Sequence, residues 1–264
     1  MPHAASTVST SGSSSHITSS VHTLIPTAEI QRLIQYLPSM QSGNLIIDSF
    51  LKGVNWRYGF PEMWLTNSWT SLLQNLPQNH EINPHWLSLF FSIFACTPQP
   101  PEGSSSNARL LNMEDNDTYH SCASTARRIA ENDYFSSSNA ISMTGGTSLV
   151  DGCILGCLAI PLLCDFLAAK GRVCEAWKLM GAGIRDAQSI GLHRDPDSSV
   201  WREMSEEEKY LRRSAWWGLY IWDRYVQLHI LVLKHIPTSE PNLVLFTRQA
   251  FILYSRKTSD YSQN

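Results

Sequence analysis

The chain has 264 residues, of which 43% are hydrophobic and 16% charged, and its formal net charge is -3. These values are typical of a globular protein that is long enough to bury a sizeable core. The slight acidity argues against a surface built to neutralise phosphates. No charged leader followed by an apolar stretch opens the chain, which excludes a secretory signal peptide. The longest apolar run, Cys153 to Cys164, is too short to span a bilayer.

The N-terminal part predicts a disordered leader followed by two helices. Residues 1–24 are rich in Ser and Thr and few are large and apolar. Apolar residues at helical spacing predict an amphipathic helix over Ala28–Leu37, capped by Thr27 and stopped by Pro38. A second helix is expected over Asn44–Val54. Its predicted buried residues are Leu45, Ile46, Ser49 and Phe50.

Three helices are predicted in the middle of the chain. The first covers Trp64–Leu76, and the second covers Pro84–Ala95, which is apolar nearly all round and should lie deep in the core. After a loop rich in Pro, Gly and Ser at 98–107, a third helix is expected over Tyr119–Phe135. It should turn Arg127, Arg128 and Glu131 outward.

Residues 149–190 predict a helical hairpin. Leu149–Lys170 is an apolar helix that contains Pro161, so a kink or break is expected near Ile160, and Gly171 should end it. Glu175–Ile190 follows as an antiparallel partner. Its predicted buried residues are Ala176, Trp177, Met180, Gly183, Ile184, Ala187 and Ile190. Together the elements predict an all-α fold, an irregular multi-helix domain with antiparallel helical hairpins.

The cysteines of this region do not have the spacing of a zinc site. Cys153, Cys157, Cys164 and Cys174 are separated by the apolar lining of a helix rather than by turns. We expect buried thiols that behave as small hydrophobic side chains, in a reducing compartment, and no metal site.

A corner and a capped helix follow the hairpin. Gly191 is expected as a left-handed cap that leaves His193, Arg194 and Asp195 exposed, with no second ligand to make His193 a metal or catalytic site. Ser205 and Glu208 form a predicted capping box.

The helix after this cap carries Arg212 and Asp223 on one stripe. Glu208 and Arg212 stand at i and i+4, a pair worth about 0.3 to 0.5 kcal/mol if it is exposed. Asp223 lies about 16 Å along the helix from Arg212, too far to pair with it. Asp223 either pairs with Arg194 or is solvated.

Two motif clusters resemble the middle homology region of fungal zinc-cluster transcription factors. One is V-N-W-R-Y at residues 54–58; the other is G-L-H-R-D at 191–195 followed by R-R-S-A-W-W at 212–217 and D-R at 223–224. The resemblance covers about residues 27–229. It implies a structural role for the motif residues, which are Asn55, Trp56, Trp177, Gly191, His193, Arg194, Arg212, Arg213, Trp216, Trp217, Asp223 and Arg224.

The resemblance also implies a function in the regulation of transcription, in the nucleus. Family members bind zinc in a separate six-cysteine cluster and read DNA through it; neither that cluster nor a heptad repeat is visible here. The expected partners are therefore the transcription machinery or a full-length family member, and no cofactor or catalytic residue is expected. Residues 230–264 depart from the family pattern, which is expected of a mis-spliced end. Such an end would leave the domain incomplete and expose Trp216, Trp217 and Trp222.

Two other functions compete with this interpretation. A helical interaction scaffold would differ in its partners and compartment. A metal-dependent helical enzyme would need an acidic cluster, for which Asp115-Asn116-Asp117, in an expected polar loop, is the nearest candidate. No nucleophile elbow, zinc-protease motif or phosphate-binding loop is present.

Overall fold

The computed structural model describes residues 27–76, 82–97, 113–137, 153–198 and 204–235. These residues form helices and loops, and none of them lies in a strand, which confirms the all-α fold. The elements are α1 (Thr27–Ile34), α2 (Met40–Gly53), the 3-10 helix η1 (Asn55–Arg57), α3 (Glu62–Asn75), α4 (Pro84–Cys96), α5 (Met113–Ser137), α6 (Cys153–Ala169), α7 (Val173–Ser189) and α8 (Glu206–His235).

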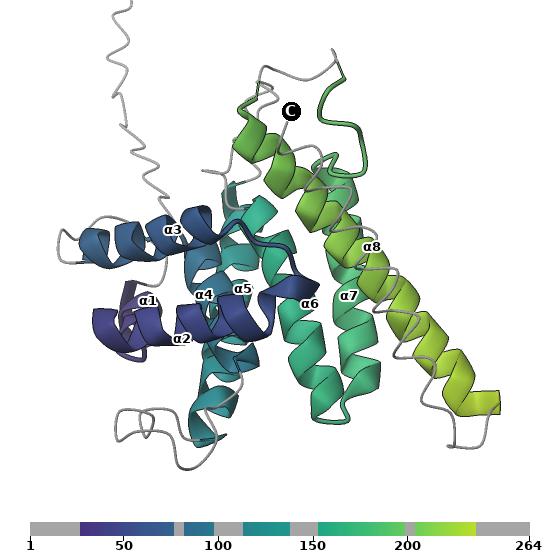
Figure 1. Cartoon of the computed structure of the whole chain (residues 1–264), viewed down its shortest axis with the longest axis horizontal. Coiled ribbons are helices and arrows are strands. Elements are labelled where there is room, and N and C mark those ends of the chain that lie inside the picture. Colours follow the sequence, from purple (N-terminus) through teal and green to yellow (C-terminus); the bar gives the residue numbers. More distant parts are fainter. Residues whose placement is uncertain (1–26, 77–81, 98–112, 138–152, 199–203, 236–264) are drawn as a thin grey trace, which may run out of the picture.

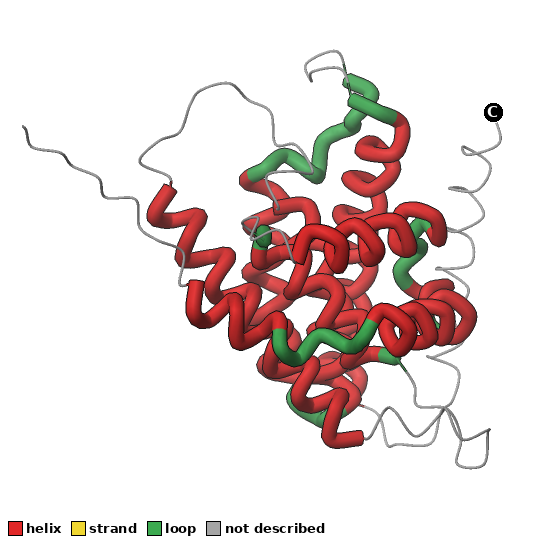
Figure 2. Tube along the Cα trace, turned by 90° about the vertical axis from the view of Figure 1, so that its left-hand side faces the viewer, coloured by secondary structure: helices red, strands yellow, loops and turns green. Residues whose placement is uncertain are grey.

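Helices α4 and α6 form the centre of the arrangement. Helix α4 contacts α5 and α6, while α6 contacts α7 and α8. The short hairpin of α6 and α7 and the oblique course of α8 beside it are visible in Figure 1. Helices α2 and α3 lie on the opposite side, and the turned view in Figure 2 shows the short loops that join neighbouring helices.

The buried surface of α4 and α6 explains this central position. Leu89, Phe90 and Ile93 of α4 are completely buried, as are Ile154 and Leu155 of α6. A helix with apolar residues on every side is stable only when neighbours cover every side. The prediction that α4 lies deep in the core is confirmed.

Helix α6 continues through Pro161, so the helix does not break near Ile160, while the kink expected as the alternative stays a prediction. Proline removes one backbone hydrogen bond, but the surrounding helices bury the adjacent turns, and Leu162 is completely buried. The predicted end at Gly171 is confirmed: its φ is 75°, and the Arg172 amide donates to the Leu167 carbonyl over 2.8 Å.

The first two helices differ from the prediction at their ends. Helix α1 ends at Ile34 rather than Leu37, and α2 begins at Met40 because the Ser39 hydroxyl accepts a hydrogen bond from the Ser42 amide over 3.2 Å. The predicted burial of Leu45 is wrong, since Leu45 is 52% exposed and Ile47 is buried in its place.

Candidate functional site

The corner after α7 has the predicted left-handed cap. Gly191 has a φ of 73°, and the Leu192 amide donates to the Ala187 carbonyl over 2.9 Å. Leu192 is buried, while the next three residues are exposed as expected. The His193 ring lies 5.9 Å from that of Trp216, so this histidine packs beside α8.

Arg212 connects α8 to this corner. Its side chain is buried, with 2% exposure, and Nη2 donates to the Ile190 carbonyl over 3.1 Å. That carbonyl lies at the C-terminal end of α7, where the last carbonyl groups have no amide donor within the helix and where a cation is favoured. Glu208, one turn earlier in α8, is buried too, so the small value for an exposed pair with Arg212 does not apply.

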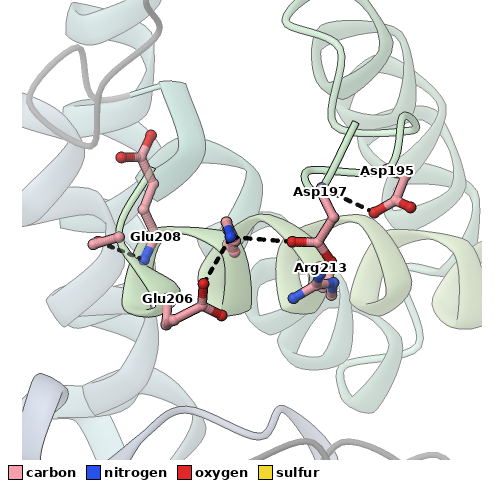
Figure 3. A network of polar contacts seen from close by, with 7 residues as sticks. Asp195, Asp197, Glu206, Glu208 and Arg213 are labelled. Atoms are coloured by element: carbon pink, nitrogen blue, oxygen red, sulfur yellow. Dashed lines mark hydrogen bonds and ion pairs between the residues drawn. The ribbon is translucent and has the colours of Figure 1, made fainter. Parts of the chain in front are cut away.

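Around the start of α8 lies a network of exposed charges, drawn in Figure 3. Asp197 pairs with Arg213 and also with Lys209, whose Nζ lies 3.1 Å from the carboxylate. Lys209 in turn pairs with Glu206 over 2.7 Å. Exposed pairs of this kind contribute little stability each, about 0 to 1 kcal/mol. Sequence reasoning missed Asp197 and Lys209, because only the folded corner brings residue 197 beside α8.

One of the two hydrogen bonds of the capping box predicted at Ser205 and Glu208 is observed. The Glu208 amide donates to the Ser205 hydroxyl over 3.2 Å. The proposed pairing of Asp223 with Arg194 stays a prediction.

The aromatic residues of α8 differ in exposure. Trp217 is 41% exposed and its ring meets Tyr220 edge-on at 5.6 Å, while the Arg224 guanidinium lies 5.2 Å above Tyr220. Trp216 is half-buried. The expected exposure of Trp222 is wrong: it is buried and packs edge-on against Tyr225. The helix continues to His235, beyond the predicted break in the family pattern.

Trp177 in α7 also corrects the sequence analysis. It was expected to be buried, yet it is 50% exposed. The buried face of α7 follows Ala176, Met180, Gly183 and Ala187. Trp177 is adjacent in sequence to Ala176 and therefore points about 100° away from that face.

The V-N-W-R-Y segment fixes η1 to α6. The Asn55 side chain donates to the Phe60 carbonyl over 2.8 Å and accepts from the Phe60 amide over 2.9 Å, while Trp56 is exposed. The next two residues reach Asp165: Arg57 Nη1 lies 2.6 Å and the Tyr58 hydroxyl 2.7 Å from its carboxylate. Burial raises the pKa of Asp165, and Arg57 and Tyr58 oppose that rise. The sequence signal for this contact was an acidic residue directly after the apolar run Cys153 to Cys164.

Arg127 of α5 does not point outward as predicted. Its side chain is 15% exposed, pairs with Glu131 and lies 3.9 Å from Asp186 of α7. It lines a cavity of about 130 Å³ between α4, α5, α6 and α7. His85 of α4 lines the same cavity, and burial together with Arg127 lowers the pKa of His85 to about 4.

The described cysteines support part of the thiol prediction. Cys157 and Cys164 are buried, and burial raises the pKa of Cys164 to about 12. The predicted burial of Cys174 is wrong because it is exposed, and the side chain of Cys153 lies outside the described residues. Within the described ranges, no three His, Cys, Asp or Glu residues are grouped so that they could hold a metal.

Two further observations concern the acidic triplet of the enzyme alternative and the possibility of a membrane-spanning helix. The triplet at 115–117 was expected in a loop but lies within α5, where Asp117 pairs with Lys170 over 2.9 Å. In the described part of the chain, no helix combines the length and apolar character needed to cross a membrane.

Comparison with known proteins agrees with the motif resemblance. The family model "Fungal specific transcription factor domain" matches residues 64–255, a range that reaches into the segment expected to depart from the family pattern. The chain is similar to the lactose regulatory protein LAC9 of Kluyveromyces lactis, with 31% identity over 102 residues. That match covers 38% of this chain and 10% of LAC9, so it spans about a tenth of the length of that relative. No solved structure matches the chain significantly. The chain therefore belongs to the fungal specific transcription factor domain family.

Proposed function

We propose that this chain regulates transcription in the nucleus through contacts with proteins, and that DNA is read by a separate module. The observation that carries the proposal is the family match over residues 64–255. The relative LAC9 is itself called a lactose regulatory protein. The partners of the present chain in this role are the transcription machinery or a full-length family member. The domain acts without catalysis or a cofactor of its own.

The surface charges support contacts with proteins rather than with phosphates. Several basic side chains of the α6–α7 turn and of α8 face protein carboxylates: Lys170 faces Asp117, Arg172 faces Glu175, and Arg213 faces Asp197. A phosphate group would have to compete with these carboxylates. Binding to nucleic acid also needs a local excess of positive charge, whereas the whole chain carries a net charge of -3.

A reporter assay in yeast tests this function. The full chain is fused to a heterologous DNA-binding domain, and transcription from its target promoter is compared with that of the DNA-binding domain alone. We expect a change in reporter output, upward or downward, and a nuclear signal when the chain alone is fused to a fluorescent protein. Unchanged transcription by a fusion that is stable and nuclear would contradict the proposal.

The same assay separates the alternatives. A cytoplasmic fluorescent signal without any reporter change would favour the interaction scaffold. A magnesium-dependent rise in melting temperature that Asp115→Ala abolishes would favour the enzyme instead.

A further inference from the structure

The cavity between α4, α5, α6 and α7 combines buried apolar walls with exposed carboxylates. We propose that it binds a small protonated amine, with the ammonium group beside Asp186 and an apolar body about the size of a six-membered ring inside the cavity. This inference rests on the cavity itself and does not depend on the transcriptional role.

The walls and the volume define the apolar part of the ligand. Ala130 of α5 and Cys157 and Ile160 of α6 line the cavity and are buried. The volume is about 130 Å³, and apolar cavities of this order accept one benzene-sized molecule. A ring-sized hydrocarbon body therefore fits these walls.

The charged side chains of the lining carry a net negative charge. Glu131 and Asp186 are 41% and 59% exposed, so their carboxylates lie where the cavity opens to solvent. Arg127 lines the cavity too, and one positive against two negative side chains leaves one net negative charge. His85 adds no charge at pH 7, because burial and Arg127 lower its pKa to about 4.

Asp186 is the carboxylate that a ligand can reach. Arg127 contacts Glu131 directly, whereas its Nη2 atom lies 3.9 Å from the Asp186 carboxylate, beyond hydrogen-bonding distance. Arg185 does not line the cavity, and its guanidinium lies close to Gly181, one turn back along α7. Burial raises the pKa of Asp186, and Arg127 and Arg185 only partly oppose that rise. The protein thus balances this charge incompletely, and a ligand ammonium group would supply the missing positive charge.

The end of α7 adds negative potential at the same place. Asp186 and Ser189 belong to the last turn of α7, and both line the cavity. The C-terminal end of a helix favours cations, and Arg212 already donates to the Ile190 carbonyl there. The Ser189 hydroxyl donates to the Asp186 carbonyl over 2.7 Å, so its oxygen can accept a hydrogen bond from an ammonium group. A ligand carboxylate would be repelled by this potential, and a neutral ligand would gain nothing from it.

Three probes of nearly equal shape test the ligand class on the full chain. Benzylamine is a cation at pH 7, benzyl alcohol is neutral and benzoate is an anion; binding is measured by titration calorimetry and by protein-observed NMR. We expect benzylamine to bind at one site with a Kd of about 1 mM or below, at least about tenfold more tightly than the other two probes. Equal or tighter binding of benzyl alcohol or benzoate, or no saturable binding of benzylamine, would overturn the proposal.

A charge-removing substitution tests the ammonium site. Asp186→Asn keeps the shape of the side chain and should weaken benzylamine binding at least about tenfold, while the binding of benzyl alcohol stays unchanged. Asp117→Asn is the matched control, since Asp117 is also 59% exposed but lies outside the cavity, and it should leave benzylamine binding unchanged. Wild-type affinity in a folded Asp186→Asn variant, or an equal loss in Asp117→Asn, would refute the role of Asp186.

A second substitution tests the apolar part and decides the matter if Asp186→Asn does not fold. Ala130→Leu fills part of the cavity and should weaken benzylamine binding at least about tenfold. Ser121→Leu adds the same side chain at an exposed position of α5 outside the cavity and should leave binding unchanged. Unchanged binding by a folded Ala130→Leu variant would place the amine elsewhere and refute the site.

Discussion

The two adjacent arginines of α8 show how differently equal side chains can act. Arg212 is buried and donates to the Ile190 carbonyl at the end of α7, whereas Arg213 is partly exposed and pairs with Asp197. A buried cation that satisfies a helix end cannot be replaced by water without rearrangement, but an exposed ion pair can. The R-R pair of the motif therefore combines one structural residue with one surface residue.

Removing each arginine in turn tests this distinction. We expect Arg212→Ala to lower the free energy of unfolding by about 2 to 4 kcal/mol, because it leaves buried polar groups without their partner. The matched control, Arg213→Ala, should cost less than about 1 kcal/mol. Urea denaturation followed by circular dichroism measures both. Equal losses in the two variants would mean that Arg212 has no special structural role.

Asp223 offers a second test at a single residue. If it pairs with Arg194 across the α7 corner, Asp223→Asn should lower the melting temperature, by a few degrees for an interaction worth about 1 kcal/mol. A double-mutant cycle with Arg194→Ala isolates the pair, since the two losses should then be non-additive. Additive losses, or an unchanged melting temperature, would rule out the pairing of Asp223 with Arg194.

At the scale of the helix, the α6–α7 hairpin depends on one glycine of a small-residue segment. The segment is Gly181-Ala182-Gly183 of α7, and Gly183 is buried as predicted. A Cβ atom at Gly183 would overlap Ile160 Cδ1 of α6, whereas one at Gly181 would lie 3.7 Å from the tip of Arg185. Of these two glycines, Gly183 is therefore the one that allows the close approach of α6 and α7.

Alanine at these two positions should have opposite effects. Gly183→Ala should destabilise the protein by about 1 to 3 kcal/mol through overpacking. Gly181→Ala should stabilise it by roughly 0.5 to 1 kcal/mol, because alanine favours a helix where space is free. Ile160→Val removes the Cδ1 atom and should restore part of the loss in the Gly183→Ala variant. Thermal unfolding of the wild type, Gly181→Ala, Gly183→Ala and the Gly183→Ala/Ile160→Val double variant measures these changes in stability. A loss in Gly183→Ala that Ile160→Val does not reduce would argue against the Ile160 contact.

For the whole molecule, long-range polar contacts fix the early helices to the later ones. Arg57 and Tyr58 reach Asp165, which is more than a hundred residues away in sequence. Tyr210 of α8 adds a second such link by donating to the Gly59 carbonyl over 2.8 Å. The V-N-W-R-Y motif thus joins the η1 region to α6, and the glycine that follows it joins the same region to α8.

The stability of the whole fold should depend on the charge of His85. Its folded pKa is about 4, below the unfolded value of about 6.5, so the unfolded chain binds the proton more readily. Stability should therefore be fully retained above pH 6.5 and fall by up to about 3 kcal/mol as the pH drops from 6.5 to 4. The check is urea unfolding across this range for the wild type and His85→Phe. The variant should lose less stability than the wild type, and parallel profiles would exclude His85 as the cause.

The sequence predicted much of the fold because the relevant forces act along the chain. Helical spacing of apolar residues located the helices, and Gly171 and Gly191 marked ends that need a left-handed residue. The cap at Ser39 was missed, since a serine beside a proline has several competing uses. For the candidate site, the motif positions were found, but the roles of Arg212, Trp177 and Trp222 were not.

What the sequence by itself determined is the all-α class, the α6–α7 hairpin, the glycine corner and the family, because each depends on local pattern or motif spacing. The tertiary structure alone decided which face of each helix is buried and which distant side chains meet. It turned Arg127 inward to a cavity, brought Asp165 to Arg57, and placed Arg212 on the end of α7. Such contacts depend on how helices pack in three dimensions, and a periodic pattern along one helix does not specify the partner on the next.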